Sequence, residues 1–163
     1  FNLIIKLHNF SWFQKRYKYQ SEMMKNLDSK LSNLYLARPN DYDVIPFMRI
    51  SDLLISDISS TIFEYLPLNR PIIMAECLSI RLKHRIFKKR FSRKLDIERY
   101  DSIDFVHRMN EPDQLNGLVY HCIEYPDELS DLRMEAIETY LYKNDGKASS
   151  RLLDEIENKL SQV

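Results

Sequence analysis

The chain has 163 residues, of which 44% are hydrophobic and 29% are charged. This composition is typical of a folded domain with a substantial core and argues against long disordered segments. The 24 Lys and Arg residues balance the 24 Asp and Glu residues, so the net charge points to no class of partner.

The sequence shows no sign of export or of a membrane-spanning helix. It has no run of about 18 apolar residues and no secretory signal pattern. Its two cysteines, Cys77 and Cys122, lie among apolar neighbours, which indicates core residues in a reducing, intracellular compartment. Their wide spacing matches no metal pattern, and we expect neither a metal nor a cofactor. With two glycines in the chain, a glycine-rich phosphate loop is excluded.

Short apolar runs alternate with helical patterns along the chain. The runs predict strands over residues 3–7, 33–37, 53–56 and 71–75, and a weak strand over 103–106. We expect helices over residues 11–30, 44–50, 59–66, 112–124, 128–142 and 148–160. This order is typical of an α/β domain with a parallel sheet covered on both faces, here one domain over residues 1–163. Because the first predicted strand begins almost at Phe1, we expect a fragment with sequence missing upstream.

Right-handed crossovers place the carboxyl ends of all parallel strands at one edge of a sheet, where ligands bind in open α/β sheets. His8, Ala37, Asp57 and Glu76 follow predicted strands. We therefore expect these four residues to share that edge.

The turn Asp57-Ile58-Ser59-Ser60-Thr61 is the sharpest candidate site. A helix beginning here would offer unpaired N–H groups and a positive dipole end to a phosphate or diphosphate. The hydroxyls of Ser59, Ser60 and Thr61 would add further donors. Serine and threonine are also common helix caps, and Thr61 with Glu64 matches a capping box. The residues alone leave both interpretations open.

His8 is the next candidate, as a general acid or base or as a donor to a phosphate oxygen. Its alternative is a histidine that ends a strand and bonds nearby backbone. Lys6 alternates with His8, so on a strand it points the same way and can neutralise a phosphate; a surface lysine is the alternative. For the other three histidines we favour structural roles, because the spacing of His84, His107 and His121 matches no metal pattern.

A basic stretch, Arg81 to Lys94, carries eight Lys or Arg residues and no acid. Its apolar residues recur at roughly helical spacing, so it can lie on an anionic membrane surface or hold a polyanion. Nucleic acid is a further option from charge alone, and a solvated loop is the alternative. The basic residues proposed for contact are Arg81, Lys83, Arg85, Lys88, Lys89 and Arg90.

Several segments together resemble the carboxy-terminal domain of the CDP-glycerol glycerophosphotransferases, which build teichoic acids and related polymers. The segments occur in the family's order across nearly the whole chain: Leu3 to His8, Ser51 to Tyr65, Asn69 to Ile73, and Asn144 to Arg151. The Asp-Ile-Ser-Ser motif followed by Phe63-Glu64 is fairly specific, and Asp-Gly-Lys-Ala-Ser at residues 145–149 is more so.

The resemblance implies the Rossmann-like carboxy-terminal half of a glycosyltransferase B type fold, which holds the nucleotide. It implies transfer of an alditol phosphate from a CDP-alditol to a hydroxyl of a growing polymer or lipid-linked acceptor, with release of CMP. The family's histidine maps onto His8 as the catalytic residue, and its phosphate-binding serine pair maps onto Ser59 and Ser60. Lys6 and Thr61 join the donor site, and Asp57 and Glu64 support it.

The same resemblance implies a bacterial enzyme held peripherally at the inner face of the cell membrane, with no nucleic-acid partner. The general base and the acceptor site are expected in the missing amino-terminal domain, so we expect this fragment to bind nucleotide weakly without turnover. Two alternatives stay open: the donor-binding half of a nucleotide-sugar glycosyltransferase, and a non-catalytic module that binds through the basic stretch.

Overall fold

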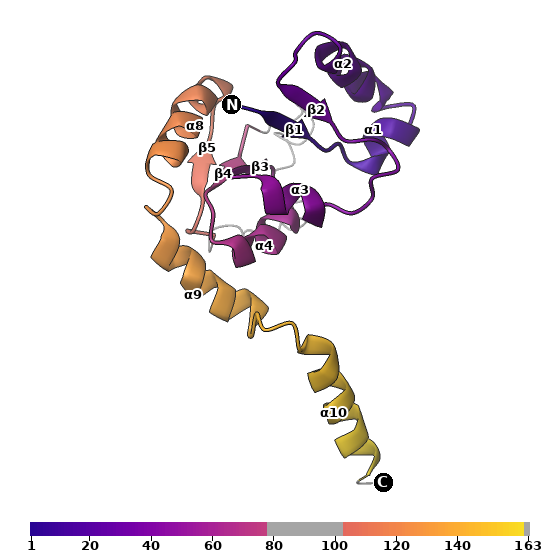
Figure 1. Ribbon diagram of the computed structural model, residues 1–163, viewed down its shortest axis with the longest axis vertical. Helices are drawn as coiled ribbons and strands as arrows, with labels where there is room; N and C mark the ends of the chain where they lie inside the picture. The colour runs from indigo at the N-terminus through magenta and orange to yellow at the C-terminus, as the bar shows by residue number, and fades with distance from the viewer. Residues whose placement is uncertain (78–102, 162–163) are drawn as a thin grey trace, which may run out of the picture. The chain divides into compact units, whose positions relative to one another are not determined.

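The computed structural model describes residues 1–77 and 103–161. The chain forms two compact units, an amino-terminal unit (Phe1–Ser51) and a carboxy-terminal unit (Asp52–Val163) (Figure 1). The basic stretch lies outside the described residues, so its predicted contacts stay predictions. The prediction of one domain over residues 1–163 also stays a prediction.

The amino-terminal unit is a parallel strand pair with helical connections. Its elements are β1 (Leu3–Ile5), α1 (Asn9–Phe13), α2 (Lys18–Asp28), β2 (Leu34–Leu36) and α3 (Ile45–Ile50). β1 and β2 pair in parallel, and Ile4 lies opposite Tyr35. The connection through α1 and α2 therefore forms the strand–helix–strand arrangement that the sequence predicts.

The single helix predicted over residues 11–30 is wrong, because two helices occupy this segment. Gln14 follows α1 with an extended backbone (φ −90°, ψ 124°), and α2 begins four residues later at Lys18. Ser11 is buried, and its Oγ donates a 2.7 Å hydrogen bond to Oε1 of Gln20. A polar contact thus joins the two helices across the break, which apolar spacing could not reveal.

The carboxy-terminal unit contains a three-stranded parallel sheet with the strand order β3-β4-β5. Ile55 lies opposite Ile73, which in turn lies opposite His107. Parallel strands flanked by helices confirm the predicted Rossmann-like α/β class. The elements of this unit are β3 (Leu54–Ser56), α4 (Thr61–Tyr65), η1 (Leu66–Leu68), β4 (Ile72–Ala75), β5 (His107–Met109), η2 (Pro112–Gln114), α8 (Leu115–Glu124), α9 (Ser130–Leu141) and α10 (Ala148–Leu160).

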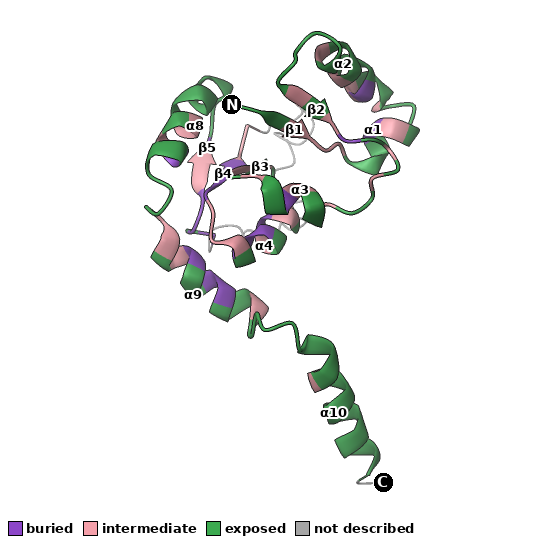
Figure 2. Ribbon diagram, in the orientation of Figure 1, coloured by how far each residue is buried: buried purple, intermediate pink, exposed green. Residues whose placement is uncertain are grey.

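The middle strand β4 forms the centre of the core, as Figure 2 shows by its burial. Ile72, Ile73 and Met74 are each 0% exposed. Ile73 packs in one cluster with Met109 and with Cys122 of α8. A continuous apolar run is what a strand covered on both faces requires, so the prediction of this strand succeeded.

The strand predicted over residues 103–106 is wrong, since β5 begins at His107. Ile103, Phe105 and Val106 are buried, but they precede the strand. The ring of Phe105 lies 6.1 Å from the rings of both Phe63 and Tyr140, measured between centroids. Phe105 is therefore buried by contacts with α4 and α9 and not by pairing in the sheet.

A buried arginine joins α9 to the connection between η1 and β4. Arg133 is 0% exposed, and its Nε donates to Oδ1 of Asn69 at 3.0 Å. Its Nη2 donates to the carbonyl oxygen of Pro126 at 2.8 Å, and its Nη1 has no hydrogen-bond partner among the described residues. Asn69 has a left-handed backbone (φ 48°) and donates from Nδ2 to Oγ of Ser130 at 2.8 Å. Burial lowers the pKa of Arg133, because desolvation disfavours the charged guanidinium.

Candidate functional site

The turn between β3 and α4 holds the predicted serines close together. Ser56 ends β3, and its Oγ lies 3.1 Å from Oγ of Ser59, within hydrogen-bond distance. Ser60 occupies the N-cap position of α4, with helical backbone (φ −57°, ψ −24°) and no side-chain cap hydrogen bond. Its exposed hydroxyl is therefore not engaged in capping the helix. In this turn, the hydroxyl of Ser59 lies within hydrogen-bond distance of Ser56, whereas the hydroxyl of Ser60 does not cap α4.

The capping box predicted for Thr61 and Glu64 is wrong. Thr61 is the first residue of α4, one position after the cap. The amides of Phe63 and Glu64 both donate to the carbonyl oxygen of Ser60, each at 3.0 Å. A side-chain cap requires an extended backbone at the cap residue, and Ser60 is helical instead.

A surface cavity of about 230 Å³ opens beside this turn, lined by Ser60, Phe63, Glu64, Tyr140 and Leu141. The rings of Phe63 and Tyr140 lie 5.0 Å apart between centroids. The cavity therefore combines a serine hydroxyl, a carboxylate and two aromatic rings from α4 and α9.

His8 and Lys6 lie between β1 and α1 in the amino-terminal unit. β1 ends at Ile5, so strand alternation does not determine the directions of these two side chains. His8 is the N-cap of α1, and its Nδ1 accepts a hydrogen bond from the amide of Phe10 at 3.2 Å. This contact places the single proton of the neutral ring on Nε2, which leaves Nε2–H as a donor.

The structure brings Ser59, Ser60, Thr61 and Glu64 together at one turn and helix start. Exposed Asp57 belongs to the same turn. Because His8 and Ala37 belong to one unit and Asp57 and Glu76 to the other, the edge that these four residues are predicted to share stays a prediction.

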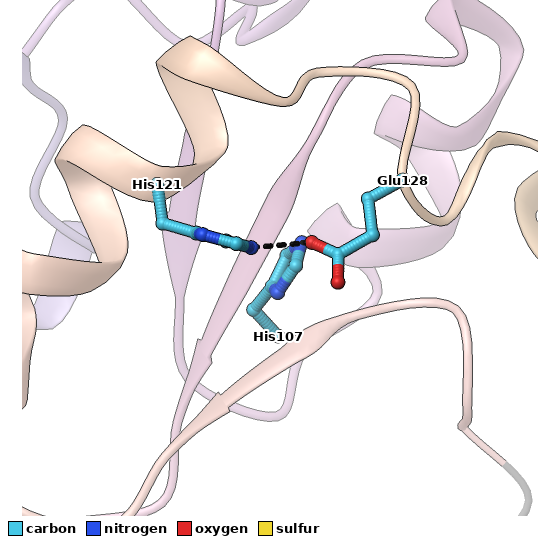
Figure 3. Close-up of side chains that lie close together, drawn as sticks. All are labelled: His107, His121 and Glu128. Carbon is cyan, nitrogen blue, oxygen red and sulfur yellow. Dashed lines mark hydrogen bonds and ion pairs between the residues drawn. The ribbon is translucent and has the colours of Figure 1, made fainter.

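A second group of side chains, which the sequence did not reveal, gathers on β5, α8 and the loop before α9 (Figure 3). His107, His121 and Glu128 each offer one nitrogen or oxygen atom, and these three atoms lie within 4.8 Å of one another. Nε2 of His121 lies 2.5 Å from Oε2 of Glu128, and Nε2 of His107 lies 3.9 Å from the same oxygen. Burial lowers the pKa of His107. We call these residues the histidine cluster.

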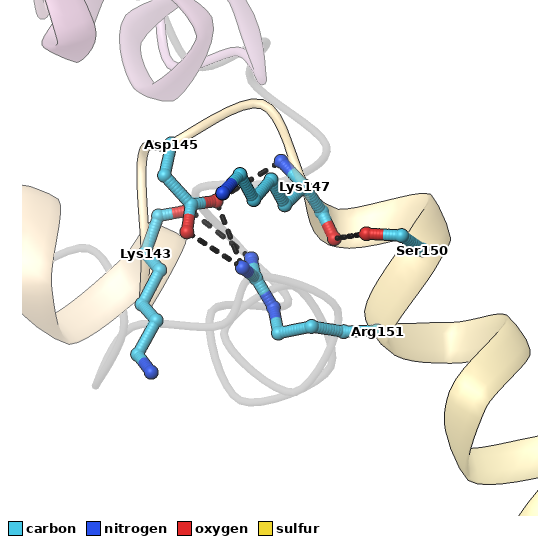
Figure 4. Close-up of polar contacts among 5 residues, drawn as sticks. All are labelled: Lys143, Asp145, Lys147, Ser150 and Arg151. Carbon is cyan, nitrogen blue, oxygen red and sulfur yellow. Dashed lines mark hydrogen bonds and ion pairs between the residues drawn. The ribbon is translucent and has the colours of Figure 1, made fainter.

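The Asp-Gly-Lys segment forms a fixed turn at the start of α10 (Figure 4). Nη1 of Arg151 donates to both carboxylate oxygens of Asp145 at 2.8 Å, and the amide of Lys147 donates to Oδ1 at 3.0 Å. Gly146 has a left-handed backbone (φ 70°). The hydrogen bond from Arg151 lowers the pKa of the Asp145 carboxyl. The predicted helix start is thereby confirmed, with a structural role for Asp145 and Arg151.

α10 carries apolar residues every four positions along one face, and these residues are exposed. Leu152, Ile156 and Leu160 are 62%, 45% and 70% exposed. Across residues 1–77 and 103–161, no helix has both the length and the apolar character that crossing a membrane requires.

Comparisons with known proteins agree in pointing to one family. A sequence profile described as CDP-Glycerol:Poly(glycerophosphate) glycerophosphotransferase matches residues 1–158. The chain is similar to the teichoic acid ribitol-phosphate primase of Bacillus spizizenii, with 34% identity over 141 residues. This similarity covers 85% of the chain and 33% of the primase, so the chain spans about a third of that relative's length. No solved structure gives a significant match.

Proposed function

The chain belongs to the CDP-glycerol:poly(glycerophosphate) glycerophosphotransferase family, and from this premise we propose that it is the donor-binding part of an alditol-phosphate transferase. The donor is CDP-glycerol or another CDP-alditol, and the acceptor is a hydroxyl of a growing teichoic-acid-like or capsular polymer. The family match over residues 1–158 is the observation that carries this proposal. The name of the Bacillus relative, a primase of teichoic acid, supports it.

The donor diphosphate binds at the β3–α4 turn in this proposal. The Ser56–Ser59 contact fixes the turn, and the hydroxyl of Ser60 is exposed beside it. Hydrogen bonds from hydroxyls to an ionised phosphate are stronger than those between neutral groups. Thr61 adds a third hydroxyl at the start of α4.

The cavity next to Ser60 suits the nucleoside better than the phosphates. The carboxylate of Glu64 would repel a diphosphate, but it can accept hydrogen bonds from ribose hydroxyls. The rings of Phe63 and Tyr140 offer apolar surface to the sugar or the base. Ser60 lines this cavity and also belongs to the turn, so it connects the two parts of the proposed donor site.

For His8 and Lys6 we propose a role at the donor diphosphate on the strength of the family match. Because Nδ1 of His8 accepts from the amide of Phe10, the neutral ring donates through Nε2–H. Lys6 contributes a positive charge. We therefore propose that His8 donates a hydrogen bond from Nε2–H to a phosphate oxygen.

The transfer forms a bond from the acceptor oxygen to the phosphorus of the alditol phosphate and breaks the bond from that phosphorus to the CMP oxygen. Charge develops on the departing CMP, so catalysis depends on stabilising that charge more than on covalent help. Lys6, His8 and the serine hydroxyls supply this stabilisation. The proton of the acceptor hydroxyl passes to a general base that we assign to no residue of this chain.

We propose that the enzyme works at the inner face of a bacterial cell membrane. The basic stretch would contact anionic lipid headgroups, each Lys or Arg near the surface adding about 1 kcal/mol. The relative is longer than this chain, and we propose that an additional amino-terminal domain binds the polymer or lipid-linked acceptor.

Calorimetric titration with CDP-glycerol, CDP-ribitol, CMP and a UDP-sugar tests the proposed donor. We expect both CDP-alditols to bind more tightly than CMP, because CMP lacks the second phosphate, and more tightly than the UDP-sugar, because the family's donor is a cytidine nucleotide. Tighter binding of the UDP-sugar would replace this proposal with a nucleotide-sugar glycosyltransferase. Binding to anionic vesicles without affinity for any of the four nucleotides would favour a non-catalytic membrane module.

A further inference from the structure

We propose that the histidine cluster, His107, His121 and Glu128, is a binding site for a divalent transition-metal ion of the Zn²⁺ class. The proposal is independent of the donor site at the β3–α4 turn. It is based on the chemistry of the three ligand atoms, the elements that hold them, and the charge of the surrounding surface.

The ligand set is the first argument. Two imidazole nitrogens and one carboxylate oxygen are ligands that Zn²⁺ and neighbouring transition metals prefer. Ligand atoms bound to one tetrahedral Zn²⁺ ion at about 2.0–2.2 Å lie roughly 3.3–3.6 Å apart. The observed distances to Oε2 of Glu128, 2.5 Å from His121 and 3.9 Å from His107, bracket that range. All three distances between the ligand atoms lie within 4.8 Å, so side-chain rotations of the two histidines and of Glu128 would be needed to bring them to the spacing of a bound ion.

The supporting elements are the second argument. His107 lies on β5, opposite Ile73 in the buried strand β4, and its side chain is 12% exposed. His121 belongs to the last turn of α8, which packs against β4 and β5. Two of the three ligands therefore project from rigid elements. Figure 3 shows the two histidines pointing toward the carboxylate of Glu128, which lies in the loop after α8. Ligands held in this way lose little conformational freedom when an ion binds.

The surface next to the cluster favours a cation. A cavity of about 530 Å³ is lined by His121, Glu128 and other residues of the α8–α9 loop, including Glu124 and Asp127. The lining therefore carries three carboxylates, those of Glu124, Asp127 and Glu128. The positive charge that interacts electrostatically with His107 is the single buried guanidinium of Arg133. The cavity also leaves room for a water molecule as a fourth ligand, as expected where a protein supplies three.

An ion at this position would tie β5, α8 and the loop before α9 together. Its binding energy would stabilise the folded carboxy-terminal unit, because the unfolded chain does not hold the three ligands in place. The inferred role is therefore stabilisation of this unit, and no step of the transfer passes through the ion.

Titration of the metal-free native chain with Zn²⁺, in competition with a chromogenic chelator, tests the proposal. We expect one ion per chain, and we expect His107→Gln, His121→Gln and Glu128→Gln each to weaken binding at least about ten-fold. Two matched controls should bind Zn²⁺ like the native chain: His8→Gln, which also removes one histidine, and Glu138→Gln, which removes an exposed carboxylate that does not line this cavity.

Nitrogen NMR of the native chain gives a second readout that requires no variant to fold. Zn²⁺ should shift the imidazole resonances of His107 and His121 and leave those of His8 in place. Absence of one-to-one binding would overturn the proposal. So would an ion that leaves both cluster histidines unshifted, or equal weakening by the cluster variants and by the controls.

Discussion

Replacing Asn69 with alanine tests how far the buried Arg133 depends on one side chain. The change removes the acceptor 3.0 Å from Nε of Arg133 and the donor 2.8 Å from Oγ of Ser130. A buried donor left without its partner costs about 1–3 kcal/mol. Alanine at φ 48° adds about 1 kcal/mol of backbone strain, which asparagine largely avoids. We therefore expect the free energy of unfolding to fall by about 2–4 kcal/mol.

Asn69→Asp is the matched control. Aspartate tolerates the left-handed backbone, still accepts from Arg133, and can accept from the hydroxyl of Ser130. It also brings a negative charge to a buried guanidinium, so we expect its stability to lie within about 1 kcal/mol of the native chain. Urea unfolding followed by far-ultraviolet circular dichroism measures both variants. Equal losses in the two, or no loss in Asn69→Ala, would refute the reasoning.

Two further predictions concern the glycines and pH. Gly117→Ala should raise the free energy of unfolding by about 0.5–1 kcal/mol, because Gly117 lies inside α8 with open space at its Cβ position. Gly146→Ala should instead weaken amide protection of α10 by about 1–2 kcal/mol, since Gly146 has φ 70°; the same sign for both variants would contradict this. Because the pKa of Asp145 is lowered in the fold, its contribution to α10 is present above the ordinary carboxyl pKa and is lost as pH falls through the lowered one. Hydrogen exchange should show this pH dependence in the native chain and not in Asp145→Asn, and an identical profile in both would contradict it.

Much of the fold follows from local patterns in the sequence. The helix expected over residues 148–160 is α10 with the same bounds, because Asp145 and Gly146 mark its start and an apolar residue recurs every four positions. The helix expected over residues 44–50 is α3, which begins one residue later. The apolar runs that became β3 and β4 were also recognisable, since strands buried on both faces are apolar along their whole length.

The errors occur where tertiary contacts decide the structure. Phe105 packs against Phe63 and Tyr140, which explains its burial. Its apolar side chain was interpreted from the sequence as part of a strand. Thr61 is a residue type that often caps helices, but Ser60 occupies the cap position and Thr61 is the first residue of α4. In both cases the residue type was interpreted correctly as buried or as part of a helix start, and only the neighbours determine which role it has.

The histidine cluster could not be predicted from spacing. Its members come from a strand, a helix and a loop, at positions 107, 121 and 128, and no local metal motif has this pattern. Only the pairing of β5 with β4 and the packing of α8 against both strands bring them together. The serine turn, by contrast, is contiguous in sequence, so its position after a strand was predictable.

The proposed donor site needs a control that separates hydroxyl loss from general destabilisation. Ser29 and Ser161 lie next to the ends of α2 and α10, and their hydroxyls donate to the carbonyl oxygens of Asn26 and Glu157. The Ser29→Ala/Ser161→Ala double variant should therefore bind CDP-glycerol like the native chain.

The central claim is that the β3–α4 turn holds the donor diphosphate. Calorimetric titration of CDP-glycerol into the native chain and into the Ser59→Ala/Ser60→Ala double variant tests it most directly. We expect the double variant to bind about 1–3 kcal/mol more weakly, which corresponds to a loss of about 5- to 150-fold in affinity. An unchanged affinity in a folded double variant would contradict the claim.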